Sequence, residues 1–279
     1  MNDSVSSHPR WGRILWLCGN GARIGVALDF GIRIVFAACD GETNLFYEQP
    51  DDLSDGFFTP EGWRLYGGHR MWPAPESDLC TAPDNLPISW VPEENGVQLT
   101  QLPDGRTGLQ KMLRIQFSED GRILLEHSFQ NISGHVLSCA SWGINSMAAG
   151  GVAKIEFPLP EQSSFQPQRA VMLWQDTSLD DPRLSFTKDA LTVTHLPLDA
   201  FCKLGLFSRS GRVVFENLRQ RFTLTFPAVR PERLADHGCN FELYLCRHFM
   251  ELETLGELVR LMPGDTASHW EAWRFEHLE

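Results

Sequence analysis

The chain has 279 residues, of which 42% are hydrophobic, and this is ample material for a large core. Its formal net charge of -12 argues against a surface for nucleic acid or an anionic membrane, because phosphate groups would be repelled. No secretory signal is evident, nor an apolar run of about 18 residues such as a membrane span requires, so we expect a cytoplasmic protein.

The seven cysteines are scattered, odd in number and without a C-x-x-C pair. This pattern predicts reduced thiols, and it disfavours both a disulfide framework and a structural zinc site. The motifs H-E-x-x-H and G-x-S-x-G and a phosphate-binding glycine loop are also missing. We therefore expect neither a metal nor a cofactor.

Strand patterning runs through the chain. Hydrophobic and polar residues alternate in segments such as 122–130 (RILLEHSFQ) and 240–246 (NFELYLC), which is the period of a half-buried strand. In chain order, the strands that we predict are residues 33–38, 96–100, 108–117, 122–130, 137–142, 190–195, 212–216, 221–227, 240–246 and 272–275.

Turn signals are frequent and helix signals are scarce. The Asp-Gly pairs at positions 104 and 120 are typical of hairpin turns. Residues 254–262 (TLGELVRLM) have a short helical period, but a glycine near the start and a Pro-Gly pair after the end weaken a helix there. No linker or repeat divides the chain, which predicts one mainly antiparallel β domain over residues 1–279.

The segment 66–76 reads YGGHRMWPAPE. It is too polar for a core strand and too broken for a helix, so we expect a rigid loop whose glycines allow close approach to a ligand. The side chains that this loop would present are His69, Arg70, Trp72 and Glu76. A lone histidine is more often structural than catalytic, but His69 follows two glycines that allow close approach to a ligand, so both alternatives stay open here.

Nine tryptophans, several of them beside polar residues, are compatible with a saccharide site on a concave sheet face. Aromatic rings stack on the C–H faces of a pyranose, and polar side chains bind its hydroxyls. Trp72, Trp142 and Trp174 are the tryptophans that we select. The alternative for any one of them is ordinary core packing.

Glu251 and Glu253 lie two residues apart, so in a strand they share one face. Their repulsion should raise the pKa of one carboxyl, and a carboxylate tuned in this way can act as a general base. Lys203 is a single cation among apolar neighbours and would reach a carboxylate or a ligand. The alternatives are a solvated strand face and a lysine that simply extends to solvent.

Five segments, in order along the chain, carry a resemblance: YGGHRMWPAPE, WQDTSLDDPRL, DAFCKLG, GCNFELY and MELETLGELVRLMPGDTASHWEAW. Together they resemble the aldose 1-epimerase-like proteins of the galactose mutarotase-like superfamily, over residues 25–275. The resemblance implies an all-β supersandwich, in which large antiparallel sheets pack face to face and a sugar binds on the concave side.

In true mutarotases of this superfamily, a glutamate removes the anomeric hydroxyl proton and a histidine protonates the ring oxygen. The Leu-Glu-Thr context assigns the base to Glu253, with Glu251 as the fallback, and the resemblance assigns a sugar contact to Arg70. The acid histidine has no counterpart, because residues 141–151 (SWGINSMAAGG) contain none. His69 is then the remaining candidate for the acid.

Two functions follow from the resemblance. One is an aldose 1-epimerase-like enzyme that acts on a sugar, and the alternative is a carbohydrate-binding protein that has lost the acid histidine. A structural or protein-interaction module is a third, weaker reading. Basic residues near the site also leave room for an acidic or phosphorylated sugar. The residues that we expect to bind substrate are Arg70, Trp72, Glu76, Trp142, Trp174, Lys203, Asn240 and Glu242.

Overall fold

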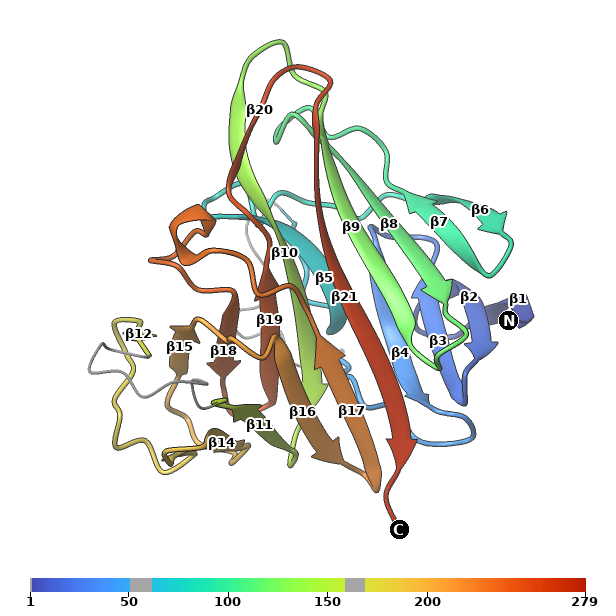
Figure 1. Ribbon diagram of the computed structural model, residues 1–279. Coiled ribbons are helices and arrows are strands. Elements are labelled where there is room, and N and C mark those ends of the chain that lie inside the picture. The colour runs from blue at the N-terminus through green and yellow to red at the C-terminus, as the bar shows by residue number, and fades with distance from the viewer. Residues whose placement is uncertain (1, 51–61, 159–168) are drawn as a thin grey trace.

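The computed structural model describes residues 2–50, 62–158 and 169–279, and the regular secondary structure of these ranges is almost entirely β-strand (Figure 1). Two large antiparallel sheets pack against each other. The helical content of the described ranges is a single 3₁₀ turn, Pro231–Arg233. A helix long and apolar enough to cross a membrane is not found in the described part of the chain.

The first sheet contains the strands that will matter for the site. Its spatial order is β1 (Asn2–His8), β2 (Gly12–Gly19), β3 (Ala22–Ala27), β4 (Arg33–Cys39), β5 (Gly68–Ala74), β10 (Leu137–Ala148), β19 (Phe249–Leu255), β18 (Phe241–Leu245), β15 (Cys202–Leu206) and β12 (Val171–Leu173), and β20 (Val259–Leu261) pairs with one end of β10.

The second sheet has the order β13 (Leu184–Phe186), β14 (Ala190–Thr194), β11 (Val152–Glu156), β16 (Arg212–Asn217), β17 (Gln220–Thr225), β21 (Thr266–His277), β9 (Ile123–Asn131), β8 (Leu109–Phe117), β7 (Gly96–Thr100) and β6 (Ser89–Glu93).

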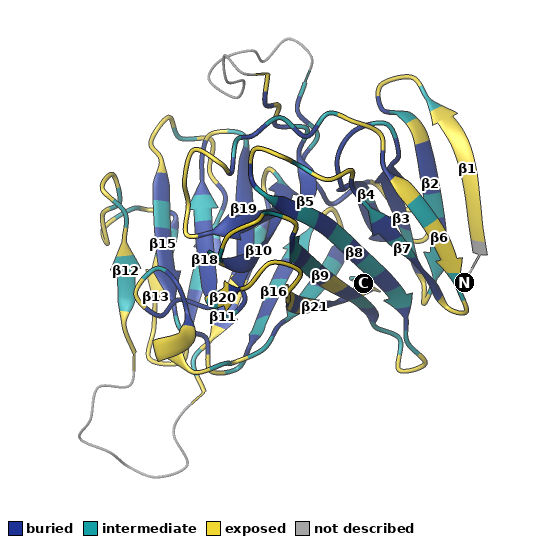
Figure 2. Ribbon diagram, turned by 90° about the horizontal axis from the view of Figure 1, so that it is seen from above, coloured by how far each residue is buried: buried dark blue, intermediate teal, exposed yellow. Residues whose placement is uncertain are grey.

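The main core lies between the two sheets, where one face of each sheet is buried (Figure 2). In β18, Leu243 and Leu245 enter this core, whereas Glu242 and Tyr244 point to the other side of the sheet. Strands of the second sheet alternate in the same way, and β8 is buried at every second residue. This alternation follows from the two-residue period of a strand, and hydrophobic burial stabilises it.

The all-β prediction is confirmed, and each of the ten predicted strands corresponds to an observed one. The largest differences in length are at β10, which continues to Ala148, and at β21, which begins at Thr266. Helical periodicity in residues 254–262 was misleading, because these residues form the end of β19 and the short β20.

The predicted loop at residues 66–76 is wrong. Its centre is β5, a strand that is buried at all seven residues. Two glycines with left-handed φ, Gly67 and Gly68, bring the start of the strand against the backbone of Tyr47 and Ile34. A β-carbon at Gly68 would lie 2.1 Å from the carbonyl oxygen of Ile34, so only glycine fits.

Candidate functional site

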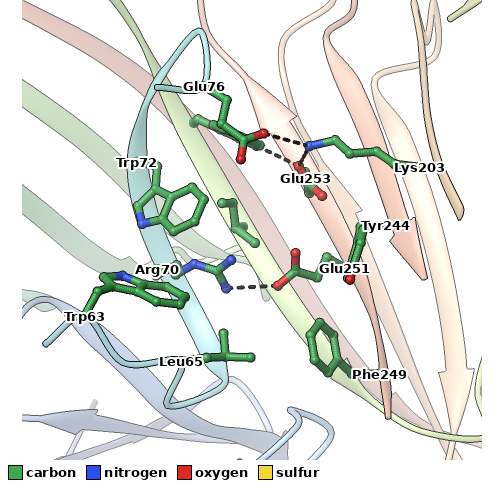
Figure 3. A pocket seen from close by; sticks show the side chains of 12 residues that line it. Trp63, Leu65, Arg70, Trp72, Glu76, Lys203, Tyr244, Phe249, Glu251 and Glu253 are labelled. Carbon is green, nitrogen blue, oxygen red and sulfur yellow. Dashed lines mark hydrogen bonds and ion pairs between the residues drawn. The ribbon is translucent and has the colours of Figure 1, made fainter. Parts of the chain in front are cut away.

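A pocket of about 270 Å³ opens on the face of the first sheet that points away from the second sheet (Figure 3). The alternation of β5 and β19 sets its position, since Arg70 and Glu251 line it while their neighbours Met71 and Leu252 enter the core. The residues that line the pocket are Trp63, Leu65, Arg70, Trp72, Glu76, Trp142, Ile144, Lys203, Tyr244, Phe249, Glu251 and Glu253.

One end of the pocket holds a buried ion pair. The Arg70 guanidinium donates to Glu251 Oε1 at 2.9 Å, and the Ser146 hydroxyl donates to the same oxygen at 2.7 Å. The guanidinium carbon also lies 4.6 Å from the centre of the Trp72 ring, within cation–π range. These contacts orient the guanidinium and leave an aromatic wall beside it.

Lys203 occupies the other end, beside Glu76 and Glu253 (Figure 3), and it also reaches Glu242. Its ammonium lies 3.1 Å from Glu242, 3.4 Å from Glu253 and 3.9 Å from Glu76. Glu242 and Glu253 are direct cross-strand partners on β18 and β19, so their side chains share one face of the sheet. The Trp142 indole N–H donates to Glu253 at 3.0 Å and fixes the orientation of that carboxyl.

Burial makes this carboxylate pair hard to ionise. It raises the pKa of Glu242 to about 8 and that of Glu253 to about 7, against the attraction of Lys203. The charge of Glu253 contributes to the rise at Glu242, and that of Glu251 to the rise at Glu253. Burial also disfavours the ammonium of Lys203, but the surrounding carboxylates outweigh it and raise the pKa of Lys203.

Neither the protein-family models nor the curated proteins contain a match to this sequence. Among the solved structures, by contrast, several chains have a similar fold. A galactose mutarotase-like protein from Clostridium acetobutylicum aligns with a TM-score of 0.58 at 9% identity, over 99% of both chains. Another, from Lactobacillus casei ATCC 334, aligns with a TM-score of 0.56 at 11% identity, over 94% of this chain and 100% of that one.

This chain has the galactose mutarotase-like fold. The Slr1438 protein from Synechocystis sp. PCC 6803 has a similar structure, with a TM-score of 0.58 and 11% identity over 99% of this chain and 100% of that one. The fold that the sequence resemblance implied is therefore confirmed. Identities this low carry the fold alone, so the activity has to be argued from the side chains.

In this galactose mutarotase-like chain, most of the residues selected from the sequence meet in one place. The pocket brings together Arg70, Trp72, Glu76, Trp142, Lys203, Glu251 and Glu253. Glu242 lies just behind its wall, against Lys203. Trp174 also lies outside the lining, with its ring centre 5.0 Å from the Lys203 ammonium.

Two of the selected residues lie elsewhere. Asn240 is buried and has a structural role. Its side-chain oxygen accepts from the backbone N–H of Ser208, and its side-chain nitrogen donates to the carbonyl of the same residue. His69 is fully buried on the opposite face of β5 from Arg70, where its ring contacts Asn145 and His127. It therefore does not face Glu253 across the pocket, contrary to the arrangement that the sequence suggested.

The pocket also has residues that sequence reasoning missed. Tyr244 was within reach, since it lies two residues after Glu242 and so shares its strand face. Phe249 alternates with the two glutamates of β19 in the same way. Trp63 and Leu65 precede β5 outside any strand, and no periodic pattern could have pointed to them.

Proposed function

We propose that the pocket binds one uncharged monosaccharide unit, and that Glu253 acts there as a general base in the interconversion of its anomers. The volume of about 270 Å³ lies just below the range of about 300–1,000 Å³ that is common for small-molecule sites, and this supports a ligand of one ring. Indole and phenyl side chains supply stacking surfaces, and the charged groups supply partners for hydroxyls.

The charge balance favours a neutral sugar over an acidic or phosphorylated one. Arg70 is already paired with Glu251, and Lys203 is shared by three carboxylates. An anionic group would have to compete with these carboxylates for each cation of the pocket. Sugar hydroxyls can instead donate to the carboxylates and accept from the two cations without displacing either pair.

The observation that carries the catalytic part is the state of Glu253. Its carboxyl is 1% exposed, it lines the pocket, and its pKa is raised to about 7. A carboxylate with a pKa close to neutral pH is well suited to remove the proton of an anomeric hydroxyl. The ring oxygen then needs a proton as its bond to the anomeric carbon breaks, and the ammonium of Lys203, which lines the pocket 3.4 Å from Glu253, can supply it.

The second candidate function is sugar binding without turnover. It is favoured by the position of His69, which the fold keeps out of the pocket. The two candidates share the binding step and differ only in whether a proton reaches the ring oxygen.

The test measures binding and anomer exchange on the same protein. A panel of aldoses, their 6-phosphates and uronic acids is titrated by calorimetry, and exchange between anomers is followed by NMR saturation transfer. We expect a neutral aldose to bind and its exchange to accelerate over the spontaneous rate. Binding without acceleration would leave the binding function alone, and no binding by any sugar would overturn both.

A further inference from the structure

A second polar cluster lies between the sheets, behind the pocket. Its members are His69 on β5, His127 on β9 and Glu271 on β21, and each of them is 0% exposed. β5 belongs to the first sheet, and β9 and β21 are neighbours in the second (Figure 1). One donor atom from each residue can be chosen so that all three lie within 4.8 Å of one another.

Asn145 determines which nitrogen of His69 faces this cluster. The Asn145 amide nitrogen donates to the carbonyl of Leu252 at 3.2 Å and to Glu271 at 3.3 Å. Its oxygen is therefore free to accept from Nδ1–H of His69, at 3.0 Å. The lone pair of His69 Nε2 then points at His127 Nε2, only 2.8 Å away.

The charge of Glu271 is the second observation. Its oxygens accept from the Thr254 hydroxyl at 2.6 Å and from the Trp273 indole at 2.7 Å. Within the described residues, however, no lysine or arginine forms an ion pair with it. Buried carboxylates are usually paired or bound to metals.

We propose that Nε2 of His69, Nε2 of His127 and one oxygen of Glu271 bind a divalent transition-metal ion, of which Zn²⁺ fits the donors best. Two neutral imidazoles and a carboxylate are a common ligand set for Zn²⁺, whereas Ca²⁺ and Mg²⁺ prefer oxygen alone. The two rings would move apart by about half an ångström to take a tetrahedral ion with bonds of about 2.0 Å.

His69 has the hydrogen-bond environment of a metal-binding histidine. Such a histidine usually donates its other ring N–H to a carbonyl or carboxylate, and His69 does so to Asn145. The ion would join β5 to β9 and β21, and so tie the sheet that carries the pocket to the sheet behind it. This inference is independent of the sugar and of the role of Glu253.

The test is metal content after refolding. The full-length chain is unfolded with a chelator, refolded with Zn²⁺, Co²⁺ or Mg²⁺, and dialysed before elemental analysis. We expect an equimolar amount of Zn²⁺ or Co²⁺ to be retained and no Mg²⁺. The Co²⁺ form should show the intense visible absorption of a tetrahedral site, and Zn²⁺ should raise the melting temperature.

The variants His127→Gln and Glu271→Gln should lose the retained metal. His277→Gln is the matched control, because His277 lies at the exposed end of the same strand, β21. The absorption spectrum of the wild-type Co²⁺ form tests the proposal even if a core variant fails to fold. Absence of retained metal in the refolded wild type, or equal metal in the wild type and both core variants, would overturn it in favour of two histidines that share a proton.

Discussion

At the scale of single residues, the proposed chemistry depends on the Glu253 carboxyl, held by the indole of Trp142 and the ammonium of Lys203. A cation beside a buried carboxylate usually keeps it ionised. At Glu253, however, burial and the nearby carboxylate of Glu251 outweigh the attraction of Lys203, and the pKa of Glu253 is raised. The reason is that Lys203 is divided among three carboxylates and cannot neutralise all of them.

The first prediction concerns Glu253 itself. Glu253→Gln keeps the size of the side chain and removes the base, so anomer exchange should fall by a factor on the order of 10²–10⁴ while sugar still binds. Saturation-transfer NMR and calorimetry measure the two effects on the same sample. Glu126→Gln, on an exposed position of the second sheet, is the control and should behave as wild type. Undiminished exchange in Glu253→Gln would remove Glu253 from the mechanism.

The second prediction concerns the pH dependence of stability that Glu242 causes. Its pKa is about 8 in the folded chain, and an unfolded glutamate has a pKa of about 4.3. The folded state therefore binds the proton more tightly, and this contribution to stability is present at low pH and lost as the pH rises through the folded pKa. Between about pH 5 and pH 8, the free energy of unfolding should fall in wild type relative to Glu242→Gln, by an amount on the order of a few kcal/mol.

Urea unfolding at several pH values measures that difference. Groups remote from Glu242 titrate equally in wild type and variant, so the difference isolates Glu242 together with its coupling to Glu253 and Lys203. Glu126→Gln should show no such trend. A constant difference between wild type and Glu242→Gln across the range would show that the folded pKa is not raised.

At the scale of elements, β5 contributes side chains both to the pocket and to the buried cluster of His69, His127 and Glu271. Its alternate residues serve opposite faces, with Arg70 and Trp72 in the pocket and His69 between the sheets. The strand begins at two glycines with left-handed φ that lie against the backbone of neighbouring segments. Because Gly67 and Gly68 have no side chains, β5 can take this position, and the pocket and the buried polar cluster both depend on it.

The third prediction tests this start of β5. Gly68→Ala has a left-handed φ of 69° and places a β-carbon 2.1 Å from a backbone oxygen. Gly121→Ala has a comparable φ of 84° but meets nothing within 4 Å. The second change should cost about 1–2 kcal/mol for conformation alone, whereas Gly68→Ala should cost more than about 4 kcal/mol. Equal losses in urea unfolding would contradict the close approach.

At the scale of the whole molecule, a buried ionic group joins the two sheets. Arg33 on β4 makes two hydrogen bonds of 2.9 Å to Asp84, and Lys111 on β8 approaches the same carboxylate at 3.8 Å. Burial alone would raise the pKa of Asp84, but Arg33 and Lys111 outweigh it and lower the pKa. The group belongs to the core contact between sheets and not to the pocket, since none of the three residues lines it.

The fourth prediction compares this buried pair with an exposed one. Arg33→Met leaves a buried carboxylate without its main partner and should cost about 3–5 kcal/mol in the free energy of unfolding. Arg13→Met breaks the pair with Asp29, in which the Arg13 side chain is 59% exposed, and should cost at most about 1 kcal/mol. Similar losses from the two changes in denaturant unfolding would show that the pair between the sheets is not desolvated as described.

Much of the fold could be predicted from the sequence, because the two-residue period of a half-buried strand is a local property. Strands such as β8, β9 and β17 alternate clearly and were found within one or two residues of their ends. β5 is buried at every position, so its burial does not alternate and the segment was mistaken for a loop. β19 is buried throughout as well, but its two glutamates still predicted a shared strand face, and only the weak helical period that begins at residue 254 was misleading.

For the site, too, part could be predicted from the sequence and part could not. The sequence by itself determined the all-β class, and it selected the two glutamates that share a face of β19 together with Arg70 and Lys203, all of which line the pocket. Only the tertiary structure decided which groups pair, because Arg70 and Glu251 are 181 residues apart in the chain. It also decided that His69 faces the second sheet. Which face of a strand is turned to which neighbour depends on how the sheets pack, and no local pattern records that.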